Sequence, residues 1–507
     1  MHLFILKKLV IKMYKFTNLT KVNGINYKNL ESARQNQYCW SMSELGDYIY
    51  VGTSRNMVPE ILKIFLGEDF KFPTSLDSSN TDNRAEIWRY KKDGSSNWQK
   101  VFKVNNENEY GFRYMVNFKP VNGNPAIYAA SAVTKGYMQV YKSVNGTVWK
   151  PVLSDVKEDS TIIGTSSRAM VVHNGKLYLA AVSESGLGRG TTLLYSSKDP
   201  EFYPWKLETL ANTDPKKNPQ GALTNMAVFN NHIYVSVSSD DGVQIWRTNG
   251  IEPKVNDWKL VVDKGFGDKD NKFTLSMGVF QEHLYVSGTK DLPLSWMIPR
   301  GCDIVRIDKD DNYEVVVGPE SISRTYSGFN NPFNIYAWQI QEHDGLLYIT
   351  TMDASTNMEL VLNLILANKE KLKLPEKIIS IIEEIYEIVV RVLNLFKYPF
   401  GFNLYVSENG EDFYPVFLDG FKNRYNYGGR ILYVDDQDNF YIGTANPVEG
   451  LEVWKRSYSR YDFDIAYDYC EYLDILDVDF EEIREKLEED FEKLEKYIPQ
   501  IREFFSR

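Results

Sequence analysis

One short pattern recurs along this chain: a tyrosine in the middle of an apolar strand that follows a short polar turn. Its seven copies contain Tyr50, Tyr128, Tyr178, Tyr234, Tyr285, Tyr348 and Tyr441. Where no insertion intervenes, successive copies are about 50 residues apart, which is the spacing of a repeated supersecondary unit. A regular repeat of this length constrains the fold more than composition does, because each unit must bury its apolar face against its neighbours.

Each repeat has four short segments in which apolar and polar residues alternate, as expected for half-buried strands. The first precedes the tyrosine strand, as in Arg168–Val172. The third is illustrated by Val243–Arg247 and Leu451–Lys455, and the fourth by Trp258–Val261. Four antiparallel strands per repeat predict an all-β fold, a seven-bladed β-propeller over residues 14–457. The last repeat lacks a fourth strand, and we expect residues 16–22 to supply it and close the ring.

The turn between the third and fourth strands carries a second pattern. Ser143-Val-Asn-Gly-Thr-Val-Trp149 and Ser407-Glu-Asn-Gly-Glu-Asp-Phe413 share a serine, an Asn-Gly pair and a closing aromatic residue. These turns resemble the Asp boxes of sialidase-like and BNR-repeat propellers. The resemblance implies a propeller fold and a structural role for the turns. The arginine triad, the Tyr–Glu pair and the Arg-Ile-Pro motif of sialidases are not matched, so it does not imply their catalysis.

Two insertions interrupt the repeat, at about residues 56–84 and 355–400. The second predicts helices over 358–371 and 376–395, the latter with an apolar stripe at every third or fourth residue. Residues 458–507 form a C-terminal extension that contains a predicted amphipathic helix over 480–505. Both insertions should emerge on one face of the ring, over the axial mouth. Three roles stay open: packing on the rim, a lid over a ligand, and self-association or partner binding through apolar helices.

The first strands of the repeats share two positions that are separated by one residue. In five repeats the second of these positions is methionine. The methionine layer predicts packing between blades. The residues two positions earlier lie nearer the mouth, and with their neighbours they form the predicted ligand site: Trp40, Arg113, Arg168, Asn225, Trp338 and Arg430. Arginine suits a carboxylate or phosphate, and tryptophan suits a ring. Alternatively, these arginines form internal ion pairs with Glu86, Asp241 or Glu452.

Two classes of function follow. In the first, the axial mouth binds a small anionic or glycan-like ligand, or a partner, without turnover. In the second, the same funnel holds an enzyme that acts on a carbohydrate or an apolar small molecule. The sequence assigns no catalytic residues and predicts no cofactor or metal site, since no catalytic motif is present and most histidines fall in turns opposite the mouth. Asp-rich turns at 308–312 and 435–438 fit ordinary hairpins better than calcium loops.

The composition limits which classes of partner and which cellular compartment are expected. The formal net charge is −11, whereas sequence-independent nucleic-acid binding needs a basic surface, so we predict no nucleic-acid partner. Three cysteines cannot build a disulfide framework. No apolar stretch is long enough for a membrane-spanning helix, and the charged start does not fit a secretory signal. These features predict a cytoplasmic protein.

Overall fold

The structure is a computed structural model of the chain. It describes residues 15–60, 72, 81–152, 162–183, 191–209, 214–290, 294–296, 298–371, 375–457, 480–492 and 499. Of the predicted elements, most of the first insertion and much of the C-terminal extension lie outside these residues.

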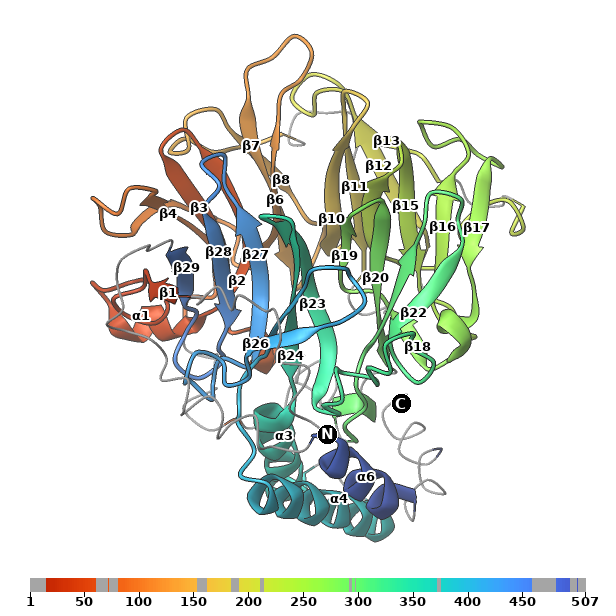
Figure 1. Ribbon diagram of the computed structural model, residues 1–507. Coiled ribbons are helices and arrows are strands. Elements are labelled where there is room, and N and C mark those ends of the chain that lie inside the picture. The colour runs from red at the N-terminus through yellow and green to blue at the C-terminus, as the bar shows by residue number, and fades with distance from the viewer. Residues whose placement is uncertain are drawn as a thin grey trace.

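The strands run almost entirely in antiparallel hairpins, and they are grouped below by their pairing (Figure 1). Blade 1 contains β2 (Asn36–Leu45), β3 (Tyr48–Arg55), β4 (Glu86–Lys91) and β5 (Gln99–Lys103). Blade 2 contains β6 (Glu109–Phe118), β7 (Ala126–Val133), β8 (Val140–Ser143) and β9 (Lys150–Pro151). Blade 3 contains β10 (Ser166–His173), β11 (Lys176–Val182), β12 (Leu193–Ser197) and β13 (Lys206–Leu207). Blade 4 contains β14 (Leu223–Phe229), β15 (His232–Val237), β16 (Gln244–Thr248) and β17 (Trp258–Val262).

The remaining strands continue the pattern. Blade 5 has an inner strand in two pieces, β18 (Asn271–Phe273) and β19 (Met277–Phe280), then β20 (His283–Lys290), β21 (Asp303–Ile307) and β22 (Tyr313–Val317). Blade 6 contains β23 (Asn334–His343), β24 (Leu346–Asp353), β25 (Leu404–Ser407) and β26 (Tyr414–Phe417). Blade 7 contains β27 (Gly428–Val434), β28 (Phe440–Ala445), β29 (Val453–Ser457) and, as its outer strand, β1 (Lys15–Asn18). The predicted all-β propeller fold is confirmed.

The ring closes between the two ends of the strand series. β1 pairs antiparallel with β29, with Lys15 opposite Ser457 and Asn18 opposite Trp454. The predicted closing segment was 16–22, and the paired strand covers its beginning. In blade 7 the first strand of the chain thus pairs with the last, and β1 covers the edge of β29, whose backbone groups would otherwise be unpaired.

A repeated apolar contact holds neighbouring blades together. The repeat tyrosines are fully buried, at 1% exposure or less. Each shares an apolar cluster with the inner Met, Ile or Leu of the next blade: Tyr50 with Met115, Tyr128 with Met170, Tyr178 with Met226, Tyr234 with Met277, Tyr285 with Ile340, Tyr348 with Leu432 and Tyr441 with Met42. The predicted methionine layer therefore packs between blades, where a flexible thioether fills irregular gaps.

The two best-matched turns after the third strand have the same hydrogen bonds. The Ser143 hydroxyl accepts from the Gly146 amide at 2.9 Å, and the Asn145 side chain accepts from the Val148 amide at 2.9 Å. In blade 6 the Ser407 hydroxyl accepts from the Gly410 amide at 2.8 Å. Both glycines have positive φ, as asparagine-glycine turns favour. The serine and asparagine side chains are therefore hydrogen-bonded within their turns, where they stabilise the scaffold.

A second repeated loop, not predicted from the sequence, precedes several inner strands. It reads Gly265-Phe-…-Asn271, Gly328-Phe-…-Asn334 and Gly420-Phe-…-Asn426. Each asparagine side chain donates to the carbonyl of the glycine six residues earlier at 3.0 Å. Both the glycine and the following phenylalanine have positive φ, which a propensity-based prediction would not assign to phenylalanine.

Helices gather at one end of the ring (Figure 1). They are α3 (Ser355–Ala367), α4 (Glu376–Leu395) and α6 (Phe480–Glu492), while short α1 (Leu30–Gln35) lies beside blade 1. The predicted bounds of α4 are confirmed, and Ile378, Ile382, Ile385, Val389 and Val392 are buried. Two short 3-10 turns lie at Lys264–Gly267 and Leu294–Trp296. No helix in the described part of the chain is long and apolar enough to cross a membrane.

Candidate functional site: the axial channel

The inner strands share an irregularity where the predicted site residues lie. In six blades an extra residue interrupts the pairing of the first strand with the second at an equivalent place, a β-bulge. The extra residues are Trp40, Arg113, Arg168, Thr224, Trp338 and Arg430. Bulges redirect side chains and occur often beside functional sites. Five of the six predicted positions therefore occupy equivalent bulges, and the structure brings Trp40 to Arg113 and Trp338 to Arg430.

These two contacts have the same construction. The Arg113 guanidinium lies 5.2 Å from the centre of the Trp40 ring, and the Arg430 guanidinium lies 5.3 Å from the centre of the Trp338 ring. In both, tryptophan comes from one blade and arginine from the next. A glycine, Gly111 or Gly428, makes room for each indole, since a Cβ on Gly428 would be 2.0 Å from the Trp338 ring. Cation–π contacts of this kind hold each guanidinium in one place.

An aromatic layer surrounds these pairs. Tyr38 contacts both indoles edge-on, with ring centres 6.5 Å from Trp40 and 5.8 Å from Trp338, and its hydroxyl is hydrogen-bonded to that of Tyr427. Burial raises the pKa of Tyr38 far above its usual value, so its phenol stays protonated. Tyr38 therefore offers a hydroxyl group but no phenolate to balance the arginines.

The helices cover the aromatic layer. One apolar cluster contains Trp40, Trp338 and Tyr427 together with buried residues of α3, α4 and α6, including Leu362, Ile385 and Leu487 (Figure 1). The helical elements thus pack on the rim and on one another, the first of the three predicted roles. At this end of the channel the cluster packs the described helices directly against the aromatic layer.

Arg430 is the electrostatic centre of the site. It is 5% exposed, and it forms no hydrogen bond or ion pair with any residue that the structure describes. Burial, together with the charge of Arg113, lowers the pKa of Arg430 from 12.5 to about 10, whereas Tyr114, Tyr38 and Cys39 act in the opposite direction. None of these four neighbours is a carboxylate. A buried guanidinium without an acceptor is unusual, because desolvating a charge is costly unless it is paired.

The other predicted residues have different surroundings. Arg168 is buried at its bulge in blade 3. Asn225 lies one residue beyond the bulge, which Thr224 occupies, and its amide donates to the Leu275 carbonyl in the next blade at 2.8 Å. Ser41, the equivalent residue in blade 1, bridges to the Phe112 carbonyl at 2.7 Å in the same way. Asn225 is therefore an inter-blade link.

Two of the three carboxylates named as alternative partners of these arginines, Glu86 and Glu452, have other partners. Glu86 lies 3.5 Å from Arg55 and 2.9 Å from Lys100, and Glu452 accepts from Asn426 at 2.8 Å. No cluster of metal-ligating side chains occurs in the described ranges. The Asp308 and Asp435 carboxylates accept hydrogen bonds within their own turns, as ordinary hairpins do. Cys39 and Cys302 are buried free thiols, and Cys470 lies outside the described residues.

Sequence reasoning missed Tyr38, Tyr110, Tyr336 and Tyr427, although a signal existed. The pattern Tyr-x-Trp occurs at 38–40 and again at 336–338. The pattern Tyr-Gly-x-Arg occurs at 110–113 and again at 427–430. Blades 6, 7, 1 and 2 are consecutive in the ring, so the site is one two-blade unit present twice. Comparing repeats with each other, rather than each with a consensus, would have found it.

Comparisons with known proteins add little. No protein-family model matches the chain, and no curated protein matches its sequence. Among solved structures, the β-propeller domain of the Trilobed protease from Pyrococcus furiosus has 9% identity and a TM-score of 0.39, covering 85% of this chain and 98% of that one. Pyrococcus horikoshii acylaminoacyl peptidase has 8% identity and a TM-score of 0.39, covering 86% of this chain and 54% of that one. Bacteroides ovatus xyloglucan PUL GH43B has 12% identity and a TM-score of 0.29, covering 47% of each. The fold therefore rests on the strand pairing.

Proposed function

We propose that this protein binds a small anion, a carboxylate or a phosphate, in its axial channel, with Arg430 as the principal charge partner. The observation that carries the proposal is the buried Arg430 guanidinium with no acceptor among the described residues. Arginine presents a planar fork of donors that matches either anion. A bound anion would supply both the missing acceptor and the missing negative charge.

Arg113 is the second cation of the proposed site. Its charge acts on Arg430, and its own guanidinium donates to the Ser166 hydroxyl at 3.2 Å while lying over Trp40. Two cations in a partly desolvated channel attract one anion more strongly than either does alone, since the local dielectric is low. The ligand we propose therefore lies between blades 7 and 2.

The indoles have a supporting role in this proposal. Trp40 is 1% exposed, and Arg113 and Tyr110 lie beside its ring. With so little surface available, Trp40 and Trp338 position arginines and do not stack on a sugar. We therefore propose an anion site and leave out the glycan-like ligand that the sequence allowed at this position.

We propose binding without turnover. Acid–base catalysis needs a group whose pKa is tuned toward the working pH. Three described carboxyls have raised pKa values, Glu109, Asp353 and Asp419. Asp353 lies at the end of β24 and is bonded to Ser355 and Tyr398 at the base of the helical insertion, and Glu109 accepts from the Tyr141 hydroxyl. None of the three belongs to the anion site proposed above, so we favour binding over the enzyme alternative.

The test is thermal unfolding in acetate, succinate or phosphate, each against chloride at equal ionic strength. We expect at least one anion to stabilise the parent, by about 2.7 kcal/mol at a hundredfold excess over its Kd. Arg430→Met should abolish this stabilisation. Without an added anion, Arg430→Met should be at least as stable as the parent, because an apolar side chain replaces an uncompensated buried charge.

Arg456→Met is the matched control. Arg456 is also buried, but it donates to the Tyr348 hydroxyl at 2.8 Å. Its loss should lower stability and leave the response to the anion intact. The proposal is wrong if none of the anions stabilises the parent, or if Arg430→Met responds to them as the parent does.

A further inference from the structure

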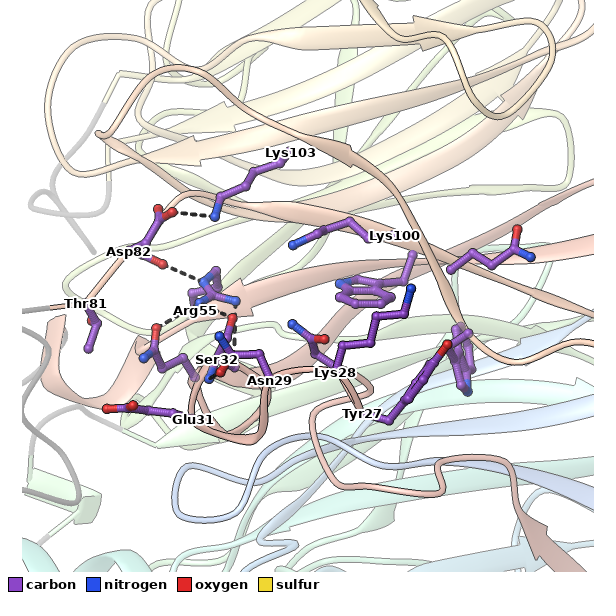
Figure 2. Close-up of a pocket in the computed structure, with 15 residues that line it drawn as sticks. Tyr27, Lys28, Asn29, Glu31, Ser32, Arg55, Thr81, Asp82, Lys100 and Lys103 are labelled. Carbon is purple, nitrogen blue, oxygen red and sulfur yellow. Dashed lines mark hydrogen bonds and ion pairs between the residues drawn. The ribbon is translucent and has the colours of Figure 1, made fainter.

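A second pocket, separate from the axial channel, opens beside blade 1 (Figure 2). It has a volume of about 840 Å³ and lies between α1 with its preceding loop and strands β4 and β5. None of the axial bulge residues lines it. Pockets of this size accommodate small-molecule ligands when a few polar groups converge on them.

The pocket has a rigid base. Arg55 is 1% exposed, and its guanidinium donates to the Asp82 carbonyl at 2.8 Å and to the Gln35 side chain at 2.8 Å. It also lies 3.5 Å from Glu86, so its charge is balanced. Arg55 thereby ties α1 to the end of β3 and fixes the two sides of the pocket relative to each other. The base is preorganised, which reduces the entropy lost on binding.

Three lysines surround this base, Lys28 on one side and Lys100 and Lys103 on the other (Figure 2). Lys100 is 2.9 Å from Glu86, and Lys103 pairs with Asp82. Lys28 is exposed and has no carboxylate partner within the described ranges. Since Lys100 and Lys103 are paired with carboxylates, the charge that favours an anionic group on the ligand is that of Lys28.

The other lining groups narrow the ligand further. The Asp82 carboxylate is paired with Arg84 and Lys103, so Glu31 is the carboxylate we assign to accept hydrogen bonds from ligand hydroxyl groups, and both carboxylates repel a polyphosphate. Tyr27 is 44% exposed, and Trp88 lies beside Lys100, whose ammonium group is 5.4 Å from the centre of its ring. An exposed aromatic ring can pack against the C–H face of a sugar. The required ligand combines hydroxyls, a ring and one acidic group.

We propose that this pocket binds an acidic saccharide, with the uronate carboxylate at Lys28 and sugar hydroxyls at Glu31. Lys28 supplies the charge, and Tyr27 supplies a surface for the sugar ring. Neither side chain is needed for folding, because both are exposed. The site is independent of the axial one and does not rest on anion binding there.

The experiment is calorimetric titration of the full chain with trigalacturonic acid, its neutral methyl ester and AMP. We expect the acid to bind and the ester to bind at least tenfold more weakly. Lys28→Glu should weaken binding of the acid at least tenfold, and Tyr27→Ala should also weaken it. Lys135→Glu, an exposed lysine away from the pocket, should stay within twofold of the parent. Arg430→Met should bind the acid as the parent does, so this site and the axial one are tested separately.

Four results would overturn the proposal. The first is no binding of the acid by the parent. The second is equal binding of the acid and the ester, which would remove the role of charge. The third is AMP displacing the acid with higher affinity, which would indicate a nucleotide site. Unchanged affinity in Lys28→Glu would also refute the placement of the carboxylate.

Discussion

The turn glycines provide a quantitative test of how one blade is locked to the previous one. Gly410 has a φ of +72°, and a Cβ there would be 1.8 Å from the Tyr285 hydroxyl oxygen and 2.7 Å from its Cζ. Gly410→Ala must therefore displace the Tyr285 ring from its core. We expect about 1–2 kcal/mol for the left-handed backbone and about 1–3 kcal/mol more for overpacking. The total loss of unfolding free energy should be about 2–5 kcal/mol.

Gly94→Ala is the matched control. Gly94 has a φ of +78°, but the nearest atom to its Cβ would be the Tyr90 hydroxyl oxygen at an ordinary 3.6 Å. It should lose only the backbone part, about 1–2 kcal/mol. Urea unfolding of both variants measures the difference. Tyr285→Phe removes the hydroxyl oxygen that would lie nearest to the added Cβ. In that background the loss of unfolding free energy caused by Gly410→Ala should fall by about 1 kcal/mol. Equal losses for the two alanines, or an unchanged cost in that background, would refute the reasoning.

Three further predictions concern the helical end of the ring. Burial raises the pKa of Asp353 from 3.8 to about 6. The contribution of Asp353 to the free energy of unfolding should therefore fall by about 3 kcal/mol as pH rises through this window. Urea unfolding of Asp353→Asn at several pH values should show that this part of the pH dependence is lost. Gly428→Ala should displace the Trp338 ring, cost about 1–3 kcal/mol in urea unfolding and weaken the anion-induced thermal stabilisation; an unchanged anion response would contradict the proposed seat of Arg430. Leu487→Asp should release α6 from α4, seen as faster amide exchange in both helices while the strands stay protected; unaltered exchange in α4 would show that α6 does not support it.

The sequence was sufficient for the scaffold because the scaffold repeats. The tyrosine recurs because packing requires it in every copy of the repeat. The closing segment and the apolar stripe of α4 are likewise local patterns that packing makes necessary. The loops with Gly265-Phe266 and its equivalents were missed because a phenylalanine with positive φ contradicts local propensity. It is stabilised by the neighbouring asparagine side chain, a contact within the loop that a pattern of apolar residues does not reveal.

The site was predicted in part, and the reason lies in the bulges. A bulged residue is released from the alternation that governs the rest of the strand, so its type is not dictated by inter-blade packing. The six bulge positions accordingly differ widely, from Thr224 to Trp40 and Arg430, whereas the position two residues later is always Met, Ile or Leu in those blades. Counting residues placed Thr224 in the same register as the other bulge positions, and Asn225, included in the predicted site as a neighbour, falls just beyond its bulge.

The variation among these positions is itself ordered, and that order supports a ligand at the axis. If the bulges served packing alone, every blade would need the same kind of side chain there. Instead, tryptophan in one blade and arginine in the next occur together twice, each time with a glycine that admits the indole. Three residue choices must agree for each pair, and the result is a buried Arg430 with no acceptor. Such an arrangement costs stability in the free protein, and the anion that we propose would offset this cost.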